Sequence, residues 1–219
     1  MAEFPGAEQY VPAKATLVTL RKAAQRCEGC DLFRNATQAV MGGGPRSARV
    51  VMVGEQPGDK EDRAGEPFVG PAGELLRRAM GDAGLDLEQV FLTNAVKHFR
   101  FEERGKRRIH KTPSAAEVVA CTPWLRAELE LVRPEMIVCL GAVAARVVIG
   151  KTHRLLQERG KFFPHALAAS VTATVHPSSI LRAPDPEQRE ENYAAFVRDL
   201  SAVRRKLGKS AAGALPISG

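Results

Sequence analysis

The chain has 219 residues, of which 44% are hydrophobic and 26% are charged, and its formal net charge is +7. That length is enough for one sizeable core but short for two full domains. No run of about 18 apolar residues is present, which argues against a membrane span. The first residues also lack the basic-then-apolar order of a secretory signal peptide, so a cytoplasmic globular protein is expected.

Helical patterns and short apolar runs alternate along the chain. Helices are predicted over residues 14–26, 71–84, 114–132, 142–150 and 187–207, and strands over 49–53, 89–96, 135–141 and 168–177. Ser114 and Glu117 have the spacing of a capping box at the start of one helix. The strands are continuous apolar runs, which is typical of a parallel sheet covered on both faces. We therefore predict an α/β fold, a three-layer α/β/α sandwich with a central, mainly parallel four-stranded sheet.

Polar residues follow the predicted strands. In such sheets, ligands bind beyond the carboxyl ends of the strands. The residues at these ends are Gly54, Glu55, Gln56 and Asp59, then Asn94, Lys97 and His98, then Gly141, and finally His176, Pro177 and Ser178. Carboxylate, amide and imidazole groups on one rim predict a functional site there.

Three of these local patterns have both a functional and a structural interpretation. The Gly-Glu-Gln-Pro-Gly turn at 54–58 permits a close backbone approach and supplies acidic groups, but it can also be a simple turn. Phe68 can stack on a flat ligand or pack in the core. His176 can donate a hydrogen bond to a ligand carbonyl or satisfy a structural contact.

The loop over residues 97–113 is strongly basic. Residues 97–111 contain seven Lys and Arg side chains against two glutamates, which is +5 of the chain's net +7. Concentrated positive charge in a folded domain suits a polyanion, although a solvated basic loop remains the alternative. In the segment Lys-Arg-Arg-Ile-His at 106–110, a histidine follows closely after three consecutive basic residues.

The chain has four cysteines, at positions 27, 30, 121 and 139. Without a signal peptide, a disulfide framework is a poor explanation, and a metal or cluster site is a better one. Cys27 and Cys30 form a chelating pair, Cys121 lies on a predicted helix, and Cys139 lies within an apolar strand. His98 is the nearest candidate for a fourth ligand. Zinc and an iron–sulfur cluster both remain open, because the spacing does not distinguish them.

Four motifs in this order resemble the uracil-DNA glycosylase superfamily, in particular its family 4. They are Gly-Glu-x-Pro-Gly at 54–58, Pro-Phe-Val-Gly at 67–70, Thr-Asn at 93–94 and His-Pro at 176–177. The resemblance covers roughly residues 20–205 and implies a [4Fe–4S] cluster. We expect a single glycosylase-like domain over residues 1–205, and a disordered tail over 206–219, where the sequence has no pattern. The family uses four cysteines for the cluster. Here Cys27, Cys30 and Cys121 match three of them, and His98 occupies the remaining place.

A second resemblance concerns Gln56, the basic loop that ends at His110, and His-Pro-Ser-Ser at 176–179. This combination is similar to UdgX, the relatives of family 4 that excise uracil and then become covalently linked to DNA through the loop histidine. By that resemblance His110 is the nucleophile that attacks C1′ of the sugar.

The resemblance also assigns roles to the other residues. The uracil would contact Gly54, Gln56, Phe68, Asn94 and His176, and catalysis would use Glu55, Gln56, Asp59, His176 and His110. The DNA would be held by Lys106, Arg107, Arg108, Lys111, Ser178, Ser179 and Arg182. The loop cations Lys106, Arg107 and Arg108 are also expected to lower the pKa of His110.

The implied partner is uracil-containing DNA, preferably single-stranded, bound by a monomer associated with the nucleoid. Two alternatives remain. One is a family 4 glycosylase that turns over, with His110 only assisting. The other is a non-catalytic iron–sulfur module that binds nucleic acid.

Overall fold

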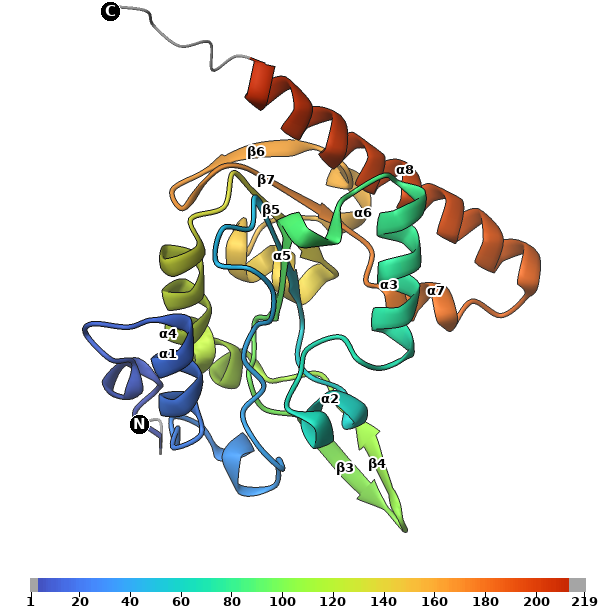
Figure 1. The fold of residues 1–219 in the computed structure, drawn as a ribbon. Coiled ribbons are helices and arrows are strands. Elements are labelled where there is room, and N and C mark those ends of the chain that lie inside the picture. The colour runs from blue at the N-terminus through green and yellow to red at the C-terminus, as the bar shows by residue number, and fades with distance from the viewer. Residues whose placement is uncertain (1–3, 213–219) are drawn as a thin grey trace, which may run out of the picture.

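A central sheet with helices on both faces organises the molecule (Figure 1). The structure is a computed structural model that describes residues 4–212, with side chains described to residue 208. The sheet has five strands in the order β2-β1-β5-β7-β6. The predicted α/β/α architecture and the mainly parallel sheet are therefore confirmed, but the predicted strand number was one too low.

Four of the strands are parallel and match the apolar runs of the sequence. They are β1 Val50–Gly54, β2 Val90–Asn94, β5 Met136–Leu140 and β7 Ala168–Thr174. The fifth strand, β6 Phe162–His165, pairs antiparallel with β7 at the edge of the sheet, with a register shift between Phe163 and His165. Pro164 hid this strand from the sequence, because proline is tolerated at a sheet edge but argues against a central strand.

Alternate residues of the central strands face two different helix layers, as the period of two requires. Val50 and Met52 of β1 pack with the layer formed by α3 Pro71–Asp82, α7 Pro177–Leu181 and α8 Pro186–Ala212. Val51 and Val53 pack on the opposite face with α4 Ala115–Val132 and α5 Ala142–Val148. Both faces are buried, which explains the absence of polar alternation in these strands.

A third apolar cluster lies beside α4 rather than on the sheet. It joins α1 Leu17–Ala24 to α4 and contains Cys27, Cys30 and Cys121 together with Trp124. The helix α4 begins at Ser114, whose side chain accepts from the Glu117 backbone N–H while Glu117 caps the Ser114 N–H. The predicted capping box is confirmed.

The short elements escaped prediction. They are α2 Asp59–Ala64, α6 Leu155–Glu158, α7 and the 3₁₀ turns Glu8–Tyr10, Asp31–Arg34 and Leu87–Gln89. Pieces of three to six residues leave too little periodicity in a sequence to be recognised.

The basic loop is an ordered hairpin. Strands β3 Phe101–Arg104 and β4 Arg107–His110 pair antiparallel, with Phe101 opposite His110, and Gly105 adopts a positive φ of 60° in the turn. The hairpin projects from the body near α2 (Figure 1). The pairing fixes His110 at the base of the hairpin, next to the domain.

The C-terminal helix is longer than predicted. Helix α8 continues to Ala212, so residues 206–212 of the expected disordered tail are helical. The rest of that tail, residues 213–219, lies outside the described part of the chain. Among residues 4–212, no helix has the length and apolar character needed to cross a membrane.

Candidate active site

A cavity of about 820 Å³ opens at the carboxyl ends of the parallel strands. Of the predicted site residues, it is lined by Glu55, Gln56, Phe68, Asn94, His110, His176, Ser178, Ser179 and Arg182. Residues far apart in the sequence therefore meet at the rim where an α/β sheet binds ligands. Asp59 does not line the cavity.

The floor of the cavity depends on the absence of a side chain at Gly54. A Cβ atom there would lie 2.3 Å from Asn94 Oδ1 and 2.8 Å from Phe68 Cζ. The glycine thus permits the amide and the aromatic ring to approach the end of β1. Within the described residues, the Asn94 side-chain amide makes no hydrogen bond, so it can pair with a ligand.

Phe68 has a constrained backbone. Its φ is +58°, a region that non-glycine residues enter rarely and that is often retained at functional sites. Arg77 donates to its carbonyl oxygen at 2.8 Å, and Gly73 leaves room for that carbonyl. The ring lies 6.3 Å from the ring of His176, with 26° between their planes.

His176 is held in one tautomer by the start of α7. Its Nδ1 accepts from the backbone N–H of Ser178 at 3.2 Å and lies 2.8 Å from the Ser178 hydroxyl. A neutral His176 therefore carries its proton on Nε2. Burial lowers the pKa of His176 to about 4, with smaller contributions from Arg182 and His110. His176 is thus a neutral hydrogen-bond donor near pH 7.

Gln56 anchors the base of the hairpin through its side-chain amide. Its Nε2 donates to the carbonyl oxygens of Arg100 and Lys111 at 3.1 and 3.0 Å, and its Oε1 accepts from the Arg100 N–H at 2.9 Å. These backbone partners determine which amide atom is nitrogen.

The same Nε2 of Gln56 lies 2.9 Å from His110 Nε2. Because an amide nitrogen can donate but not accept, His110 Nε2 must be the unprotonated nitrogen. A neutral His110 therefore carries its proton on Nδ1. The Gln56 amide has two hydrogens, and His110 Nε2 shares them with the carbonyl oxygens of Arg100 and Lys111. The lone pair of His110 Nε2 is therefore only partly engaged.

The charge state of His110 has a different cause from the one expected. Burial lowers its pKa, and Arg182 lowers it further. The pKa of His110 is therefore lowered by burial and by Arg182, and not by Lys106, Arg107 and Arg108 as expected. The relevant cation lies after α7, on another element of the cavity wall.

Glu55 carries an unpaired oxygen beside His110. Its Oε1 is buried without a hydrogen-bond partner and lies 3.9 Å from His110 Nε2. Burial raises the pKa of Glu55, while Arg182 and Arg146 oppose that shift. A carboxylate in this position can stabilise positive charge that develops nearby.

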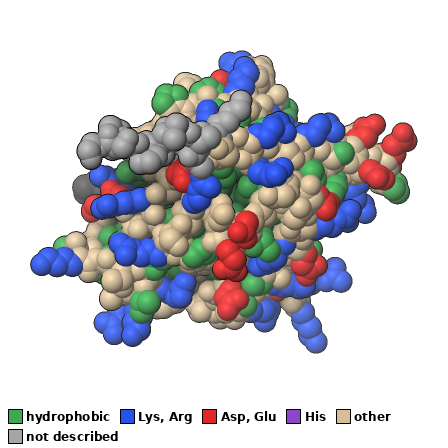
Figure 2. All heavy atoms as spheres, turned by 45° about the horizontal axis from the view of Figure 1, so that its top comes forward, with side chains coloured by type: hydrophobic (Ala, Val, Ile, Leu, Met, Phe, Trp, Pro, Cys, Tyr) green, Lys and Arg blue, Asp and Glu red, His purple; other side chains and the backbone are tan. Residues whose placement is uncertain are grey.

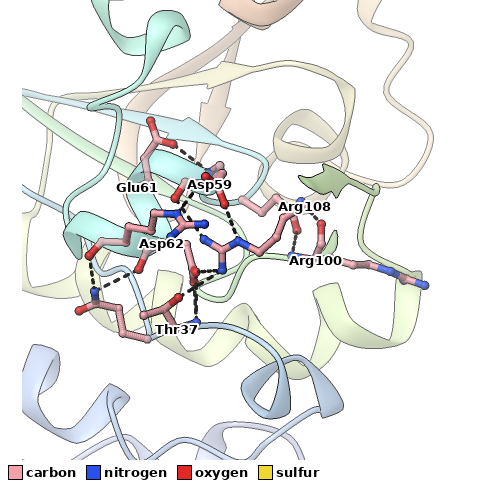
Figure 3. A network of polar contacts seen from close by, with 10 residues as sticks. Thr37, Asp59, Glu61, Asp62, Arg100 and Arg108 are labelled. Atoms are coloured by element: carbon pink, nitrogen blue, oxygen red, sulfur yellow. Dashed lines mark hydrogen bonds and ion pairs between the residues drawn. The ribbon is translucent and has the colours of Figure 1, made fainter. Parts of the chain in front are cut away.

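Asp59 and Arg108 belong to a separate network that fastens the hairpin to α2 (Figure 3). Arg108 donates to Asp59, and to Asp62 at 2.7 Å. The Arg108 side chain is only 13% exposed, and Asp62 is fully buried. Burial would raise the pKa of Asp59, but its hydrogen bonds from Arg63 and Arg108 lower it overall. Asp59 was expected in catalysis and Arg108 on phosphate; in this structure each pairs with the other.

Most other cations of the hairpin region are also paired. Lys111 contacts Glu102 at 2.6 Å, and Arg100 contacts Glu117 at 2.6 Å. Among the described residues, only Lys106 and Arg107 of the expected DNA-binding hairpin cations make no ion pair. Figure 2 shows Lys and Arg side chains spread over one face of the molecule, with acidic side chains between them. Positive charge is therefore less concentrated at the hairpin than the sequence suggested.

The serines after His176 also have local roles. Ser178 contacts His176 and accepts from Arg182 at 3.0 Å, and the Ser179 hydroxyl donates to the His176 carbonyl oxygen at 2.7 Å. Both still line the cavity, as does Arg182.

Glu61 is a site residue that the sequence did not reveal. It lines the cavity, and its two oxygens accept from the backbone N–H groups of Gly58 and Gly70 at 3.1 and 2.7 Å. It thereby joins the Gly-Glu-Gln-Pro-Gly turn to the segment that bears Phe68. The only sequence signal for this capping role is the position of Glu61, three residues after Gly58. Ile109, Thr112, Leu155 and Leu156 were also missed as lining residues.

A buried ion pair supports Asn94 from behind. Lys97 Nζ contacts Glu128 Oε2 at 2.6 Å, and both side chains are 1% exposed. Lys97 also donates to the Asn94 carbonyl oxygen at 2.7 Å, while Glu128 accepts from Thr93 and from the Gly42 N–H. Every charge in this network has a partner, as a buried pair requires.

Three of the four cysteines share one buried environment. Trp124 Nε1 lies 3.2 Å from Cys27 Sγ, and the Lys97 N–H lies 3.2 Å from Cys121 Sγ. Burial raises the pKa of Cys30 to about 11 and that of Cys121 to about 12, and the neighbouring cysteines add to both shifts. Cys139 belongs to the separate cluster on the sheet.

Whether this environment suits a metal cluster can be judged from its donors. Three thiols that influence one another and receive N–H groups have the chemistry of an iron–sulfur site. His98 is 6% exposed, and burial lowers its pKa to about 4, so its imidazole is neutral as a ligand requires. Its charged neighbour is Asp62. Within residues 4–212, no three His, Cys, Asp or Glu side chains are already arranged to hold a metal ion.

Comparison with known proteins identifies the family of the chain. Residues 41–201 match the family model of the Uracil DNA glycosylase superfamily. The chain is 36% identical over 159 residues to a type-4 uracil-DNA glycosylase of Thermotoga maritima, covering 72% of this chain and 79% of that protein. It is 35% identical over 177 residues to a type-4 enzyme of Archaeoglobus fulgidus, covering 78% and 84%. A type-5 uracil-DNA glycosylase of Pyrobaculum aerophilum is 32% identical over 157 residues, covering 63% and 64%. The chain belongs to the uracil-DNA glycosylase superfamily and is homologous to its type-4 members.

Proposed function

We propose that this protein is a uracil-DNA glycosylase that removes uracil, preferably from single-stranded DNA, and then captures the abasic sugar covalently through His110. The observation that carries the second step is the position of His110 Nε2. This atom lies at the cavity, 2.9 Å from an amide nitrogen that can only donate and 3.9 Å from Glu55 Oε1. It therefore presents a lone pair at the place where the sugar of a bound nucleotide would lie.

The base would enter the cavity after leaving the helical stack, because its glycosidic bond is inaccessible inside a duplex. Phe68 offers a ring for stacking, and the unpaired amide of Asn94 can read the polar edge of uracil. His176 can donate from Nε2 to a uracil carbonyl oxygen. As the bond to the sugar lengthens, negative charge develops on the base, and this hydrogen bond stabilises it.

The reaction begins with heterolytic cleavage of the C1′–N1 bond. The electron pair leaves with uracil, which later takes a proton from water. The sugar becomes oxocarbenium-like, with positive charge that the Glu55 carboxylate can stabilise.

His110 then supplies the electron pair of a new C1′–Nε2 bond. The imidazolium formed in this way loses its Nδ1 proton to solvent and becomes neutral. Water could attack the same atom, but a positioned group competes through effective molarities of roughly 10⁵ M or more. The resulting carbon–nitrogen bond has no leaving group activated for release, so the product is a stoichiometric adduct.

We assign DNA-backbone contacts to Lys106 and Arg107 at the hairpin tip and to Arg182 at the cavity. Lys111, Ser178 and Ser179 lie close enough to this surface to assist. Arg108 would serve the hairpin rather than the phosphates, because its guanidinium is already bound to Asp59 and Asp62. Asp59 likewise acts in this proposal through the hairpin rather than on the substrate.

We further propose a [4Fe–4S] cluster held by Cys27, Cys30 and Cys121, with His98 as the fourth ligand. When bound, it would act as a structural tie between the N-terminal segment and α4. The raised thiol pKa values mean that binding must release protons from Cys30 and Cys121.

A second candidate is a type-4 glycosylase that turns over, with His110 only assisting. The names of the relatives at 35–36% identity favour it, because they are type-4 uracil-DNA glycosylases. The two candidates differ in whether the enzyme remains bound to its product.

The deciding experiment mixes the protein with uracil-containing single-stranded DNA, boils the mixture in detergent and separates it on a denaturing gel beside thymine DNA. We expect a shifted band that requires uracil and that disappears in His110→Ser, which should instead release abasic DNA. Cleavage after alkali without a shifted band would establish the second candidate. An adduct that persists in His110→Ser would exclude His110 as the nucleophile. Binding of the DNA without release of uracil would refute the proposed glycosylase activity.

A further inference from the structure

The unusual backbone of Phe68 needs support from neighbouring groups. A bulky residue keeps a φ of +58° only where its surroundings leave it no alternative. The ring lines the active-site cavity, is 5% exposed and lies against the end of β1, where a Cβ atom on Gly54 would be 2.8 Å from Cζ. The ring and the backbone carbonyl of Phe68 are attached to the same Cα. Groups that fix the carbonyl therefore also fix the direction of the ring.

Two residues of α3 meet the Phe68 carbonyl oxygen. Gly73 and Arg77 are four residues apart, so they lie on the same side of the helix. A Cβ atom on Gly73 would lie 1.7 Å from this oxygen, which shows that the carbonyl rests directly against the helix backbone. Arg77 Nη1 donates to the same oxygen at 2.8 Å. The glycine makes room for the carbonyl, and the guanidinium holds it there.

Within the described residues, the guanidinium of Arg77 has no carboxylate partner. The adjacent Arg78, in contrast, pairs with Asp82 at 3.9 Å and lies over the ring of Tyr193. Arg77 lines a second cavity of about 530 Å³ and does not line the active-site cavity. It therefore reaches Phe68 from behind. From this position Arg77 does not touch a base in the active-site cavity and can influence it only through Phe68.

We propose that Arg77 is a positioning residue for uracil excision, because it holds the Phe68 ring in the orientation against which the base stacks. The inference rests on the proposed glycosylase function. A base that stacks on a fixed ring keeps its glycosidic bond in the reactive orientation, and a small misplacement lowers the rate of bond cleavage. A hydrogen bond from a charged donor is one of the stronger kinds. Its loss would let the carbonyl turn, and the ring would turn with it.

The test measures uracil release from a single strand in single turnover over a range of enzyme concentrations. Wild type, Arg77→Met and Arg77→Lys are compared for the rate at saturation and for the half-saturating concentration. Arg78→Met is the matched control, because it removes a cation of the same helix that contacts Tyr193 and does not line the active-site cavity. Arg77→Met is also combined with Phe68→Leu, which removes the aromatic ring. Melting temperatures establish that each variant is folded.

We expect Arg77→Met to lower the saturating rate about 10-fold, the lower end of the value of a hydrogen bond from a charged group. The half-saturating concentration should stay within about twofold, because contacts to the DNA are unchanged. Arg77→Lys retains a donor and should recover most of the rate, and Arg78→Met should stay within about twofold of the wild type. In the Phe68→Leu background, Arg77→Met should cause no further loss, because two residues that act through one ring are not additive.

A saturating rate for Arg77→Met within about twofold of the wild type, or an equal loss in Arg78→Met, would refute the proposal. A higher half-saturating concentration at an unchanged saturating rate would make Arg77 a DNA contact instead. A further loss in the Phe68→Leu background would show that Arg77 does not act through the ring. A wild type that releases no uracil would overturn the proposed function, and the inference with it.

Discussion

Replacing Gln56 by methionine should separate covalent capture from the rest of the reaction. The change preserves most of the side-chain volume but removes the amide that holds the Arg100 and Lys111 backbone and faces His110 Nε2. Three backbone hydrogen bonds of about 1 kcal/mol each give an anchor of about 3 kcal/mol, roughly a factor of 10² in the population of the docked hairpin base. Adduct formation should slow by up to that factor.

The same variant should shift the pH dependence of adduct formation. Attack requires neutral His110, and the amide donor opposite Nε2 disfavours a proton there. Its removal should raise the pKa of His110, while burial and Arg182 still act to lower it. The wild-type rate should begin to fall only at a pH below the ordinary histidine pKa, and the rate of Gln56→Met should begin to fall at a higher pH than that of the wild type.

The assay follows the boiled adduct on denaturing gels over time between pH 4 and 8, with uracil release measured separately. Gln25→Met is a matched control, because the Gln25 amide clamps the Ala39 backbone through two hydrogen bonds and does not line the cavity. If Gln56→Met forms adduct at the wild-type rate with an unchanged pH profile, the anchoring and tautomer argument is wrong.

Four further predictions address other parts of the molecule. Uracil release should not titrate with His176 between pH 5 and 8, because a group with a lowered pKa of about 4 remains neutral there; single-turnover release across pH checks this. Glu128→Ala should destabilise the fold by about 3–5 kcal/mol, since it leaves the ammonium of Lys97 buried without its carboxylate; urea melts measure the loss, and a value below 1 kcal/mol would contradict it. Arg108→Met should loosen the hairpin from α2, giving faster tryptic cleavage of the hairpin and slower adduct formation at unchanged single-strand affinity. Finally, the proposed iron–sulfur cluster should give the purified protein a brown colour, iron and acid-labile sulfide; Cys121→Ser should lose all three, whereas Cys139→Ser, which lies in the separate apolar cluster on the sheet, should retain them.

Much of the site could be predicted because the carboxyl ends of parallel strands lie along one edge of a sheet. Once Val50–Gly54 and Val90–Asn94 are recognised as buried strands, their carboxyl ends must share a rim, and Glu55 and Asn94 must approach one another. The positions of His110 and His176 came from motifs and from the resemblance. Their tautomers did not, because these depend on the backbone groups of Ser178 and on the Gln56 amide.

The parts that escaped prediction depend on contacts between distant residues. The charged strands of the β3–β4 hairpin have little apolar alternation, and the partners of Arg108 lie 46 and 49 residues away in the sequence. No local pattern distinguishes a guanidinium that binds phosphate from one that binds buried aspartate. The edge strand β6 was missed for a related reason, since Phe162–His165 is short and interrupted by proline.

The internal pairing of the hairpin cations has a consequence for how the protein finds DNA. With Arg108 and Lys111 neutralised by carboxylates, the hairpin tip offers chiefly Lys106 and Arg107 to the backbone. Each phosphate contact on a single strand contributes about −0.7 to the slope of log affinity against log salt, so two contribute about −1.4. The hairpin would then release few counterions and hold unmodified DNA weakly. Weak retention would suit the proposed permanent bond to DNA, because the protein could leave every site that lacks uracil.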